Sequence, residues 1–424
     1  MTMRVRTVSM VIIALAIMGL ASCGHYTCGA NFGSSTCAAG PPSLSGGGTG
    51  GSAAAAFVFV LNGTATGSVV GYTLNTSVNP PTLTSTANFT APVTPTADSG
   101  IGMAVAQKQF LYAAFGSTQQ ILGWTISSTG TLSAVSGGAV NLPSTFATGG
   151  TTTFDTRRVI TNPAGTLLFI ADDFGSQIFV YQIGGGGVLS AVTGSPFSVF
   201  PLSPGNMTTD GLGTFLYVTE TFSDHTGDAV AAFSIGSGNS LGVLTAVPGS
   251  PFVGTPFDMW QVQGEPTGKF LIGTKGMSAS VNGSDDLNLH VFSIGSSGAI
   301  SFVAPFPTTN SPFSIAVDPN TGSGDLIYAF GLDDAGTAFN PVEGFALSSS
   351  GALTKVNGSP FAAGAVGSEG QFDQSGGLLF VYGGLFDINT VVYRVTALDV
   401  ATGNLTTPTG IGTFGGFWVG TDAP

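Results

Sequence analysis

The amino-acid sequence predicts an all-β protein, and three observations support that prediction: its composition, its internal repeat and its two ends. Only 7% of the 424 residues are charged, whereas 65 are glycine and 43% are hydrophobic. Surface helices need Lys, Glu and Arg on their solvated faces, so a chain this poor in charge is not rich in helix. Its hydrophobic content can fill a core, which argues against disorder. The apolar residues come in short runs, as in short strands.

The internal repeat predicts the architecture. Each copy contains a first apolar strand that ends in a turn, a second FLYV-like strand and a polar loop. A third strand such as 178–181 and a fourth such as 188–192 follow. Seven copies with a period of about 50 residues predict a seven-bladed β-propeller of four-stranded antiparallel blades. The recurring four-residue apolar run lies at Phe57–Val60, Phe110–Ala113, Leu167–Ile170, Phe215–Val218, Phe270–Gly273, Leu326–Ala329 and Leu378–Val381.

The two ends of the repeat region complement each other. The first copy lacks a leading innermost strand, because a Gly/Ser/Ala-rich run joins directly to Phe57. The C-terminus has one strand too many, at 416–420. If this strand completes the first blade, the ring closes and no long sheet edge is left unpaired. We therefore predict closure by the C-terminal strand.

The N-terminus has the pattern of an export signal. Arg4 and Arg6 precede an apolar run, 8–20, that is too short to span a bilayer comfortably. Leu-Ala-Ser-Cys at 20–23 resembles a bacterial lipobox, in which the Cys is lipidated after cleavage. The alternative is an ordinary signal peptide with a chance Cys. The predicted segments are a lipoprotein signal peptide (1–22), a lipidated Cys23 with its tether (23–56) and the propeller (57–424).

The cysteines and the residue after Cys23 make the predicted localisation more specific. Gly24 stands where an Asp would indicate inner-membrane retention, so the outer membrane is favoured if the host has two membranes. With Cys23 lipidated, Cys28 and Cys37 remain as an even pair in an oxidising compartment. They are candidates for a small disulfide loop in the tether, and the alternative is two free thiols.

The charge balance limits the partners. The formal charge is −13, from 9 basic and 22 acidic residues. Nucleic-acid binding needs a stripe of Lys and Arg, which this chain lacks. The predicted partners are a membrane, through the lipid, and an envelope protein or glycan. We expect a monomer.

The repeats resemble the YVTN-type, lactonase-like seven-bladed propellers, a group that includes 6-phosphogluconolactonase relatives. The resemblance extends from about residue 56 to the C-terminus. It is based on FLYV-like strands, on Pro-x-Gly turns such as 265–268, and on Gly-Ser-Pro-Phe ends at 194–197, 249–252 and 358–361. It implies the propeller fold and, as an activity, lactone hydrolysis. Because a common fold carries many functions, the activity must be argued from a site.

A candidate catalytic group follows from that resemblance. Lactone opening needs a base and a cation or donor for the developing oxyanion. His225 is the candidate base, Glu220 or Asp224 its orienting carboxylate, and Arg157 or Arg158 the oxyanion holder. Glu220 follows an FLYV strand, where family enzymes often place a Glu, but their Pro-His pair before an innermost strand is missing. The alternative for His225 is an exposed loop residue.

The loops predict an acidic face. Propeller strands alternate in direction, so the loops after second strands and the segments leading into first strands share one face, around the mouth of the central channel. Asp258 lies in such a lead-in segment, and Lys275 is a further basic residue near this face. The loop acids include Asp172, Asp173, Asp285, Asp286, Asp333 and Asp334.

This acidic face has two interpretations. Clustered carboxylates are Ca²⁺ ligands, so it could bind a divalent cation or a cationic partner. Alternatively, a charge-poor protein places its few carboxylates in solvated loops. No EF-hand or RTX spacing occurs, so no metal ligands are assigned and no cofactor is predicted, with Ca²⁺ left open.

Two functions remain at this stage. The first is a membrane-anchored, extracytoplasmic binding or scaffold protein that uses its loop-rich face. The second is a lactonase-like hydrolase of lactones, with Glu220 and His225 at its centre. The poverty in His, Lys and Arg and the missing Pro-His pair favour the first. The resemblance over the whole domain favours the second.

Overall fold

The fold is described from a computed structural model. The predicted signal peptide and nearly all of the tether, with Cys23, Cys28 and Cys37, lie outside the described residues. The described residues are 56–62, 69–75, 82–89, 100–116, 118–137, 139–143, 159–199, 203–221, 229–275, 286–319, 325–332, 342–361, 369–372, 378–382, 390–394 and 416–422.

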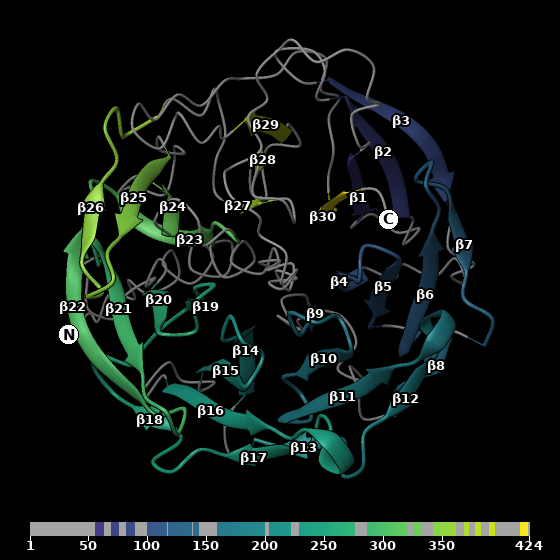
Figure 1. Cartoon of the computed structure of the whole chain (residues 1–424), viewed down its shortest axis with the longest axis horizontal. Coiled ribbons are helices and arrows are strands. Elements are labelled where there is room, and N and C mark those ends of the chain that lie inside the picture. Colours follow the sequence, from purple (N-terminus) through teal and green to yellow (C-terminus); the bar gives the residue numbers. More distant parts are fainter. Residues whose placement is uncertain are drawn as a thin grey trace, which may run out of the picture.

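The described strands form seven antiparallel sheets, which stand around a ring like the blades of a propeller (Figure 1). From the centre outward, blade 1 contains β30 (Gly416–Asp422), β1 (Ala56–Asn62), β2 (Val69–Asn75) and β3 (Thr82–Phe89). Blade 2 contains β4 (Gly100–Ala106), β5 (Phe110–Phe115), β6 (Gln120–Ile126) and β7 (Leu132–Ala134), with β8 (Val140–Asn141) also on β6. Blade 3 contains β9 (Val159–Thr161), β10 (Leu167–Asp172), β11 (Gln177–Ile183) and β12 (Leu189–Ala191), with β13 (Phe197–Ser198) also on β11.

The other four blades follow the same order. Blade 4 contains β14 (Ser203–Thr209), β15 (Phe215–Thr221), β16 (Ala229–Ile235) and β17 (Leu244–Ala246), with β18 (Phe252–Val253) also on β16. Blade 5 contains β19 (Gln261–Gly264), β20 (Phe270–Thr274), β21 (Asn288–Ile294) and β22 (Ile300–Pro307). Blade 6 contains β23 (Ser311–Val317), β24 (Asp325–Leu332), β25 (Glu343–Leu347) and β26 (Leu353–Lys355), and blade 7 contains β27 (Glu369–Phe372), β28 (Leu378–Tyr382) and β29 (Thr390–Arg394).

Among the residues that the structure describes, helix is confined to two single turns. These 3₁₀ turns are η1 (Gly185–Gly187) and η2 (Gly238–Ser240), each between the third and fourth strands of a blade. Within the described ranges, no helical segment has the length and apolar character that a membrane crossing requires. The prediction of an all-β propeller is confirmed.

The C-terminal strand closes the ring, as predicted. β30 pairs antiparallel with β1 over seven residues, with Phe57 opposite Thr421 and Val60 opposite Trp418. The other edge of β1 pairs with β2, so β1 is an interior strand. β30 also contacts the inner strands of both neighbouring blades, β4 and β27. The chain therefore supplies the inner strand of its first blade last.

The hydrophobic core lies between the blades. Each predicted apolar run forms part of a second strand, and all six residues of β5 are buried. These strands are apolar on both faces because a neighbouring blade packs against each face. One core cluster, for example, joins Phe169 of blade 3 to Met207 and Leu216 of blade 4.

A glycine in the turn after the third strand lets neighbouring blades approach closely. The carbonyl oxygen of Gly298 in blade 5 accepts a hydrogen bond of 2.9 Å from the buried Tyr217 hydroxyl of blade 4. Gly298 has φ +84°, and a Cβ there would collide with the ring of Phe215. Gly187 and Tyr112 repeat this contact between blades 2 and 3, at 2.7 Å. Only glycine meets both the conformational and the steric demand.

The Gly-Ser-Pro-Phe motif also has a structural reason. Its serine hydroxyl accepts a hydrogen bond from a backbone N–H in the middle of the third strand. At this point the outermost strand is interrupted. Ser195 accepts from Val180 at 2.9 Å, and Ser250 accepts from Ala232 at 2.8 Å. The motif therefore satisfies a donor that would otherwise lack a partner.

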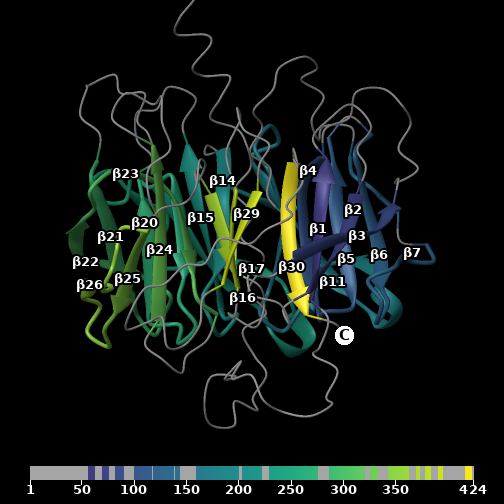
Figure 2. The same ribbon diagram turned by 90° about the horizontal axis from the view of Figure 1, so that it is seen from above.

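The strand directions divide the ring into two faces. In Figure 2, β1 runs upward and β30 runs downward. Loops after second strands and lead-in segments before first strands therefore share one face, here named the loop face. The turns between first and second strands and between third and fourth strands lie on the opposite face, here named the turn face.

Candidate functional site

The structure does not test the predicted catalytic group. Arg157, Arg158 and His225 lie outside the described residues, as do Asp285, Asp333 and Asp334. Glu220 is described through its backbone, which pairs with Pro204 on one side and Ala229 on the other. It lies near the end of β15, at the loop face.

Asp172 and Asp173 are engaged within their own loop. The Asp172 carboxylate is buried and accepts hydrogen bonds from the Gly175 N–H at 3.0 Å and the Gln177 side chain at 2.9 Å. Asp173 is partly exposed and accepts from the Phe174 N–H. Asp172 thus closes the turn between β10 and β11. No group of three metal-ligating side chains occurs in the part of the chain that the structure describes.

The strand that carries Glu220 is fixed to blade 5. The hydroxyl of Thr219, the residue before Glu220, donates to the Trp260 carbonyl oxygen at 3.1 Å. The Asn206 side chain donates to the same oxygen at 2.9 Å. These bonds place the end of β15 beside the segment that leads into β19. The end of β15, where Glu220 lies, therefore borders the loop face of blade 5.

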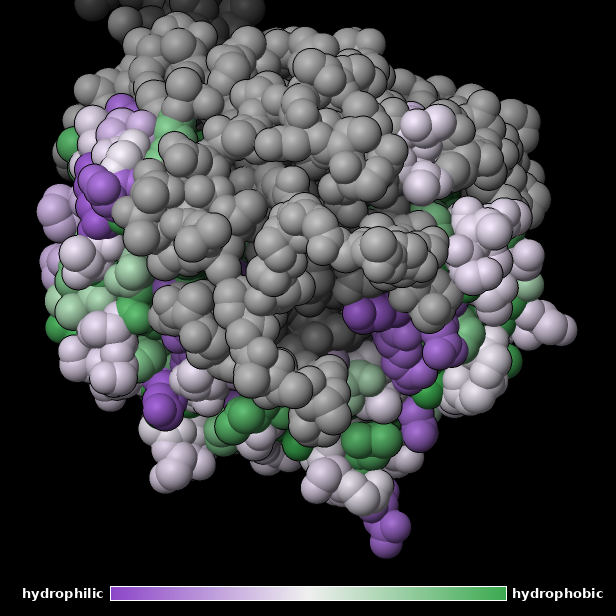
Figure 3. Space-filling model, turned by 45° about the horizontal axis from the view of Figure 1, so that its top comes forward, coloured by the Kyte–Doolittle hydropathy of each residue, from purple (hydrophilic) through white to green (hydrophobic). Residues whose placement is uncertain are grey.

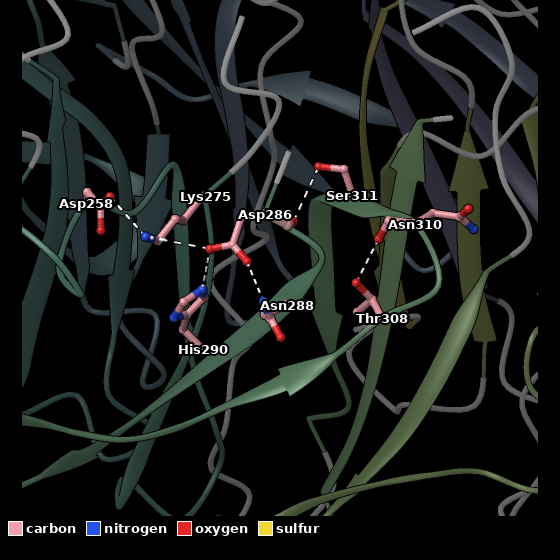
Figure 4. A network of polar contacts seen from close by, with 8 residues as sticks. All are labelled: Asp258, Lys275, Asp286, Asn288, His290, Thr308, Asn310 and Ser311. Atoms are coloured by element: carbon pink, nitrogen blue, oxygen red, sulfur yellow. Dashed lines mark hydrogen bonds and ion pairs between the residues drawn. The ribbon is translucent and has the colours of Figure 1, made fainter. Parts of the chain in front are cut away.

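A polar network lies on that part of blade 5 (Figure 4). The Lys275 Nζ is 3.0 Å from Asp258 Oδ2 and 3.6 Å from Asp286 Oδ2. Asp258 precedes β19, Lys275 follows β20 and Asp286 precedes β21. The lead-in segment and the second-strand loop thus meet at one ammonium group. We name Asp258, Lys275, Asp286, Asn288 and His290 the loop-face network.

Side chains of β21 hold the Asp286 carboxylate in place. It accepts a hydrogen bond from Asn288 Nδ2 at 2.7 Å, and His290 Nε2 lies 2.8 Å away. Partial burial by itself would raise the pKa of Asp286. The hydrogen bonds from His290 and Asn288 and the nearby positive charge of Lys275 outweigh it, so that the pKa lies below its usual value. Asp286 is therefore ionised at neutral pH.

His290 is the buried member of the network. Its side chain is only 6% exposed, and its ring lies 5.9 Å from that of Phe302. Its Nδ1 is buried and has no hydrogen-bond partner among the described residues. A nitrogen closed to solvent cannot take a proton from a substrate, so His290 positions Asp286.

The surroundings of the network are polar and partly exposed. Lys275 and Asp286 each keep 19% of their side chains exposed. Trp260 is partly exposed and follows Asp258 by two residues. Ser311 of blade 6 donates to the Asp286 carbonyl oxygen at 3.5 Å. Figure 3 shows the hydrophilic described residues in several separate groups, the most extended of them right of the centre of the view.

The network can recognise hydroxyl groups. Ionised carboxylates accept hydrogen bonds, and an ammonium donates up to three. A sugar or polyol presents several hydroxyls that both donate and accept. Aspartate and lysine side chains in one partly exposed place suit such a ligand, because a few placed polar groups fix its orientation.

The turn face holds a second carboxylate pair, Glu265 of blade 5 and Asp325 of blade 6. Glu265 is fully buried and accepts from the backbone N–H groups of Thr267, Lys269 and Phe270, at 2.6, 2.5 and 3.0 Å. Burial and the neighbouring Glu265 raise the pKa of Asp325, at the start of β24, to about 6. Glu265 thus caps the Pro-x-Gly turn and has a structural role.

Sequence reasoning found only part of the network. Asp286 was among the predicted loop acids, and Asp258 and Lys275 were placed near the same face. Their contact was not predicted, nor was the role of Asn288 and His290. The available signal was the alternation Asp286-x-Asn288-x-His290, which points one side chain in two to the same side of a strand.

Comparisons with known proteins identify the fold. No family model and no curated protein matches the chain. A proposed 6-phosphogluconolactonase from Bacteroides uniformis matches with a TM-score of 0.62 and 17% identity, covering 87% of this chain and 99% of that one. A periplasmic gluconolactonase from Pseudomonas aeruginosa matches with a TM-score of 0.59 and 15% identity, covering 87% and 100%. A protein from Lactobacillus plantarum matches with a TM-score of 0.61 and 15% identity, covering 88% and 100%.

These structures agree with the chain over almost their whole length but at low identity, so the shared property is the fold. The chain has the β-propeller fold of lactonase-like structures.

Proposed function

We propose that this protein is an exported propeller that binds a polyhydroxylated ligand, a sugar or sugar lactone, on the loop face of blade 5. One observation carries the proposal: a partly exposed lysine is held between two carboxylates. A buried structural ion pair would leave no polar atom for a ligand. Here the exposed fractions of Lys275 and Asp286 leave donors and acceptors open to one.

Lactone hydrolysis is the second candidate. It is supported by the fold shared with structures described as gluconolactonases. In this reaction Lys275 would stabilise the oxyanion that forms when water attacks the lactone carbonyl carbon, before the ring C–O bond breaks. The base that takes the proton from water would be supplied by the adjoining Glu220 and His225 segment. His290 is not that base, because its free nitrogen is buried.

Calorimetric titration of the full chain with glucose tests ligand binding. We expect saturable binding that Lys275→Met weakens at least about tenfold, because the central donor is lost. Lys355→Met is the matched control: Lys355 also pairs with a carboxylate, that of Glu343 at 2.6 Å, but on an outer strand of blade 6. Equal affinities for glucose in both variants would contradict the proposed site.

An assay with glucono-1,5-lactone separates the two candidates. A rate above the spontaneous one that falls in Lys275→Met and in His225→Ala supports hydrolysis. Binding of glucose without any rate above background supports a binding protein.

We also propose that Cys23 anchors the chain to the cell envelope. The lipobox-like segment supports this, and so does the tether that follows it. We expect the full chain to remain with the membrane fraction and Cys23→Ala to be released from it. Retention of Cys23→Ala in the membrane fraction, beside a released soluble control, would exclude lipid anchoring at this residue.

A further inference from the structure

The loop-face network carries an excess of negative charge. It contains two carboxylates, Asp258 and Asp286, and a single ammonium, Lys275. The ammonium already contacts both carboxylates, and Asp286 is ionised at neutral pH. When His290 is neutral, a ligand approaching the network therefore meets one more negative than positive charge, and a protonated His290 would cancel this excess.

The other basic residues of the described chain stand elsewhere. Lys108 and Lys269 lie in turns between first and second strands, on the turn face. Lys355 lies on the outer strand β26 and pairs with Glu343. Arg394 pairs with Leu378 at the turn-face end of blade 7. Within the described ranges, Lys275 is thus the only lysine or arginine at the loop face.

One oxygen of the Asp258 carboxylate has no hydrogen-bond donor among the described residues. Its Oδ2 accepts from Lys275 at 3.0 Å, but its Oδ1 is buried and has no partner among the described residues. A ligand cannot hydrogen-bond to an oxygen that is closed to solvent, so Asp258 acts on an approaching ligand through its negative charge.

We propose that the loop-face network selects the ligand by charge: it accepts neutral sugars and amino sugars and rejects phosphorylated sugars. This inference rests on the proposed sugar-binding function and names its substrate class. A phosphate monoester carries a charge between about −1.5 and −2 at pH 7 and would be repelled by the uncompensated carboxylate. The ammonium of an amino sugar would be attracted to it.

Three probes that share the glucose ring but differ in charge test the selection. Dissociation constants of glucose, glucosamine and glucose 6-phosphate are measured by calorimetry on the full chain at pH 7 and low salt. We expect glucosamine to bind most tightly and glucose 6-phosphate about tenfold more weakly than glucose. We expect high salt to narrow these differences, because counterions screen the charges.

Two variants locate the effect. Asp258→Asn should reduce the discrimination between glucosamine and glucose 6-phosphate, because it leaves the network neutral. Asp173→Asn removes a carboxylate from the loop face of blade 3 and should leave the discrimination unchanged.

The possible failures are distinguishable. If glucose binds and glucose 6-phosphate binds as tightly or more tightly, charge selection is wrong and the proposed function stands. If none of the three sugars binds, the proposed function fails and charge selection fails with it.

Discussion

The two ends of blade 5 hold carboxylates in different ways. On the turn face, Glu265 is enclosed and accepts three backbone N–H groups of a single turn. On the loop face, Asp286 accepts from side chains of β21 and lies near Lys275, and it remains partly exposed. A carboxylate such as Glu265, which accepts hydrogen bonds from backbone N–H groups of its own turn, fixes that turn. A carboxylate such as Asp286, which lies near a partly exposed lysine, can replace part of its contact with the lysine by a contact with a ligand.

The pKa shifts follow the same division. On the turn face, burial and the neighbouring Glu265 raise the pKa of Asp325 to about 6, although the charge of Lys269 acts to lower it. With Lys275 and His290 beside it, the pKa of Asp286 is lowered. The turn face thus supports the fold, and the loop face keeps its charge available. Variants at each end should separate stability from binding.

The largest effect on stability is expected for Gly298→Ala on the turn face. A Cβ there collides with Phe215 and the backbone has φ +84°, so we expect a loss of about 3 kcal/mol in the free energy of unfolding. Gly238→Ala is the control, because its φ is +57° but nothing lies within 4 Å of the added Cβ. It should cost about 1 kcal/mol. Equal losses in urea unfolding would show that the blades do not pack as described.

A smaller effect is expected for Tyr217→Phe. The variant removes the hydroxyl that donates to the Gly298 carbonyl but keeps the ring, so the loss should be about 1 kcal/mol. Tyr72→Phe offers a comparison at a tyrosine that is not fully buried. Thermal unfolding of both proteins measures the difference. An unchanged melting temperature in Tyr217→Phe would argue against this bond between blades.

The smallest effect is a difference in pH dependence. Because the folded-state pKa of Asp325 is raised from 3.8 to about 6, the folded chain holds this proton more tightly than the unfolded chain. Its contribution to stability is complete below pH 3.8 and is lost as the pH rises through about 6. We expect Asp325→Asn to remove this part of the decline. Parallel stability curves for wild type and variant between pH 4 and 7 would refute the raised pKa.

The fold could be predicted from the sequence because its determinants repeat. The second strands, the Pro-x-Gly turns and the Gly-Ser-Pro-Phe motif recur at a regular period, so each copy supports the interpretation of the others. Closure by β30 followed from two complementary irregularities at the ends. Even the bond from Tyr217 to Gly298 has a counterpart in Tyr112 and Gly187.

The loop-face network could be predicted only in part because it occurs once. Asp258 and Lys275 are 17 residues apart in the chain, and only the pairing of β19 with β20 brings them together. Side chains that meet through tertiary structure leave no period in the sequence. The predicted catalytic residues Arg157, Arg158 and His225 lie outside the described residues and remain a prediction.

One measurement tests the separation of the two ends most directly: the dissociation constant for glucose of Gly298→Ala and of Lys275→Met, each below its unfolding temperature. We predict that Gly298→Ala binds within about twofold of wild type despite its lower stability, and that Lys275→Met binds at least about tenfold more weakly with little change in stability. If Gly298→Ala loses binding while Lys275→Met keeps it, the loop-face network is not the ligand site.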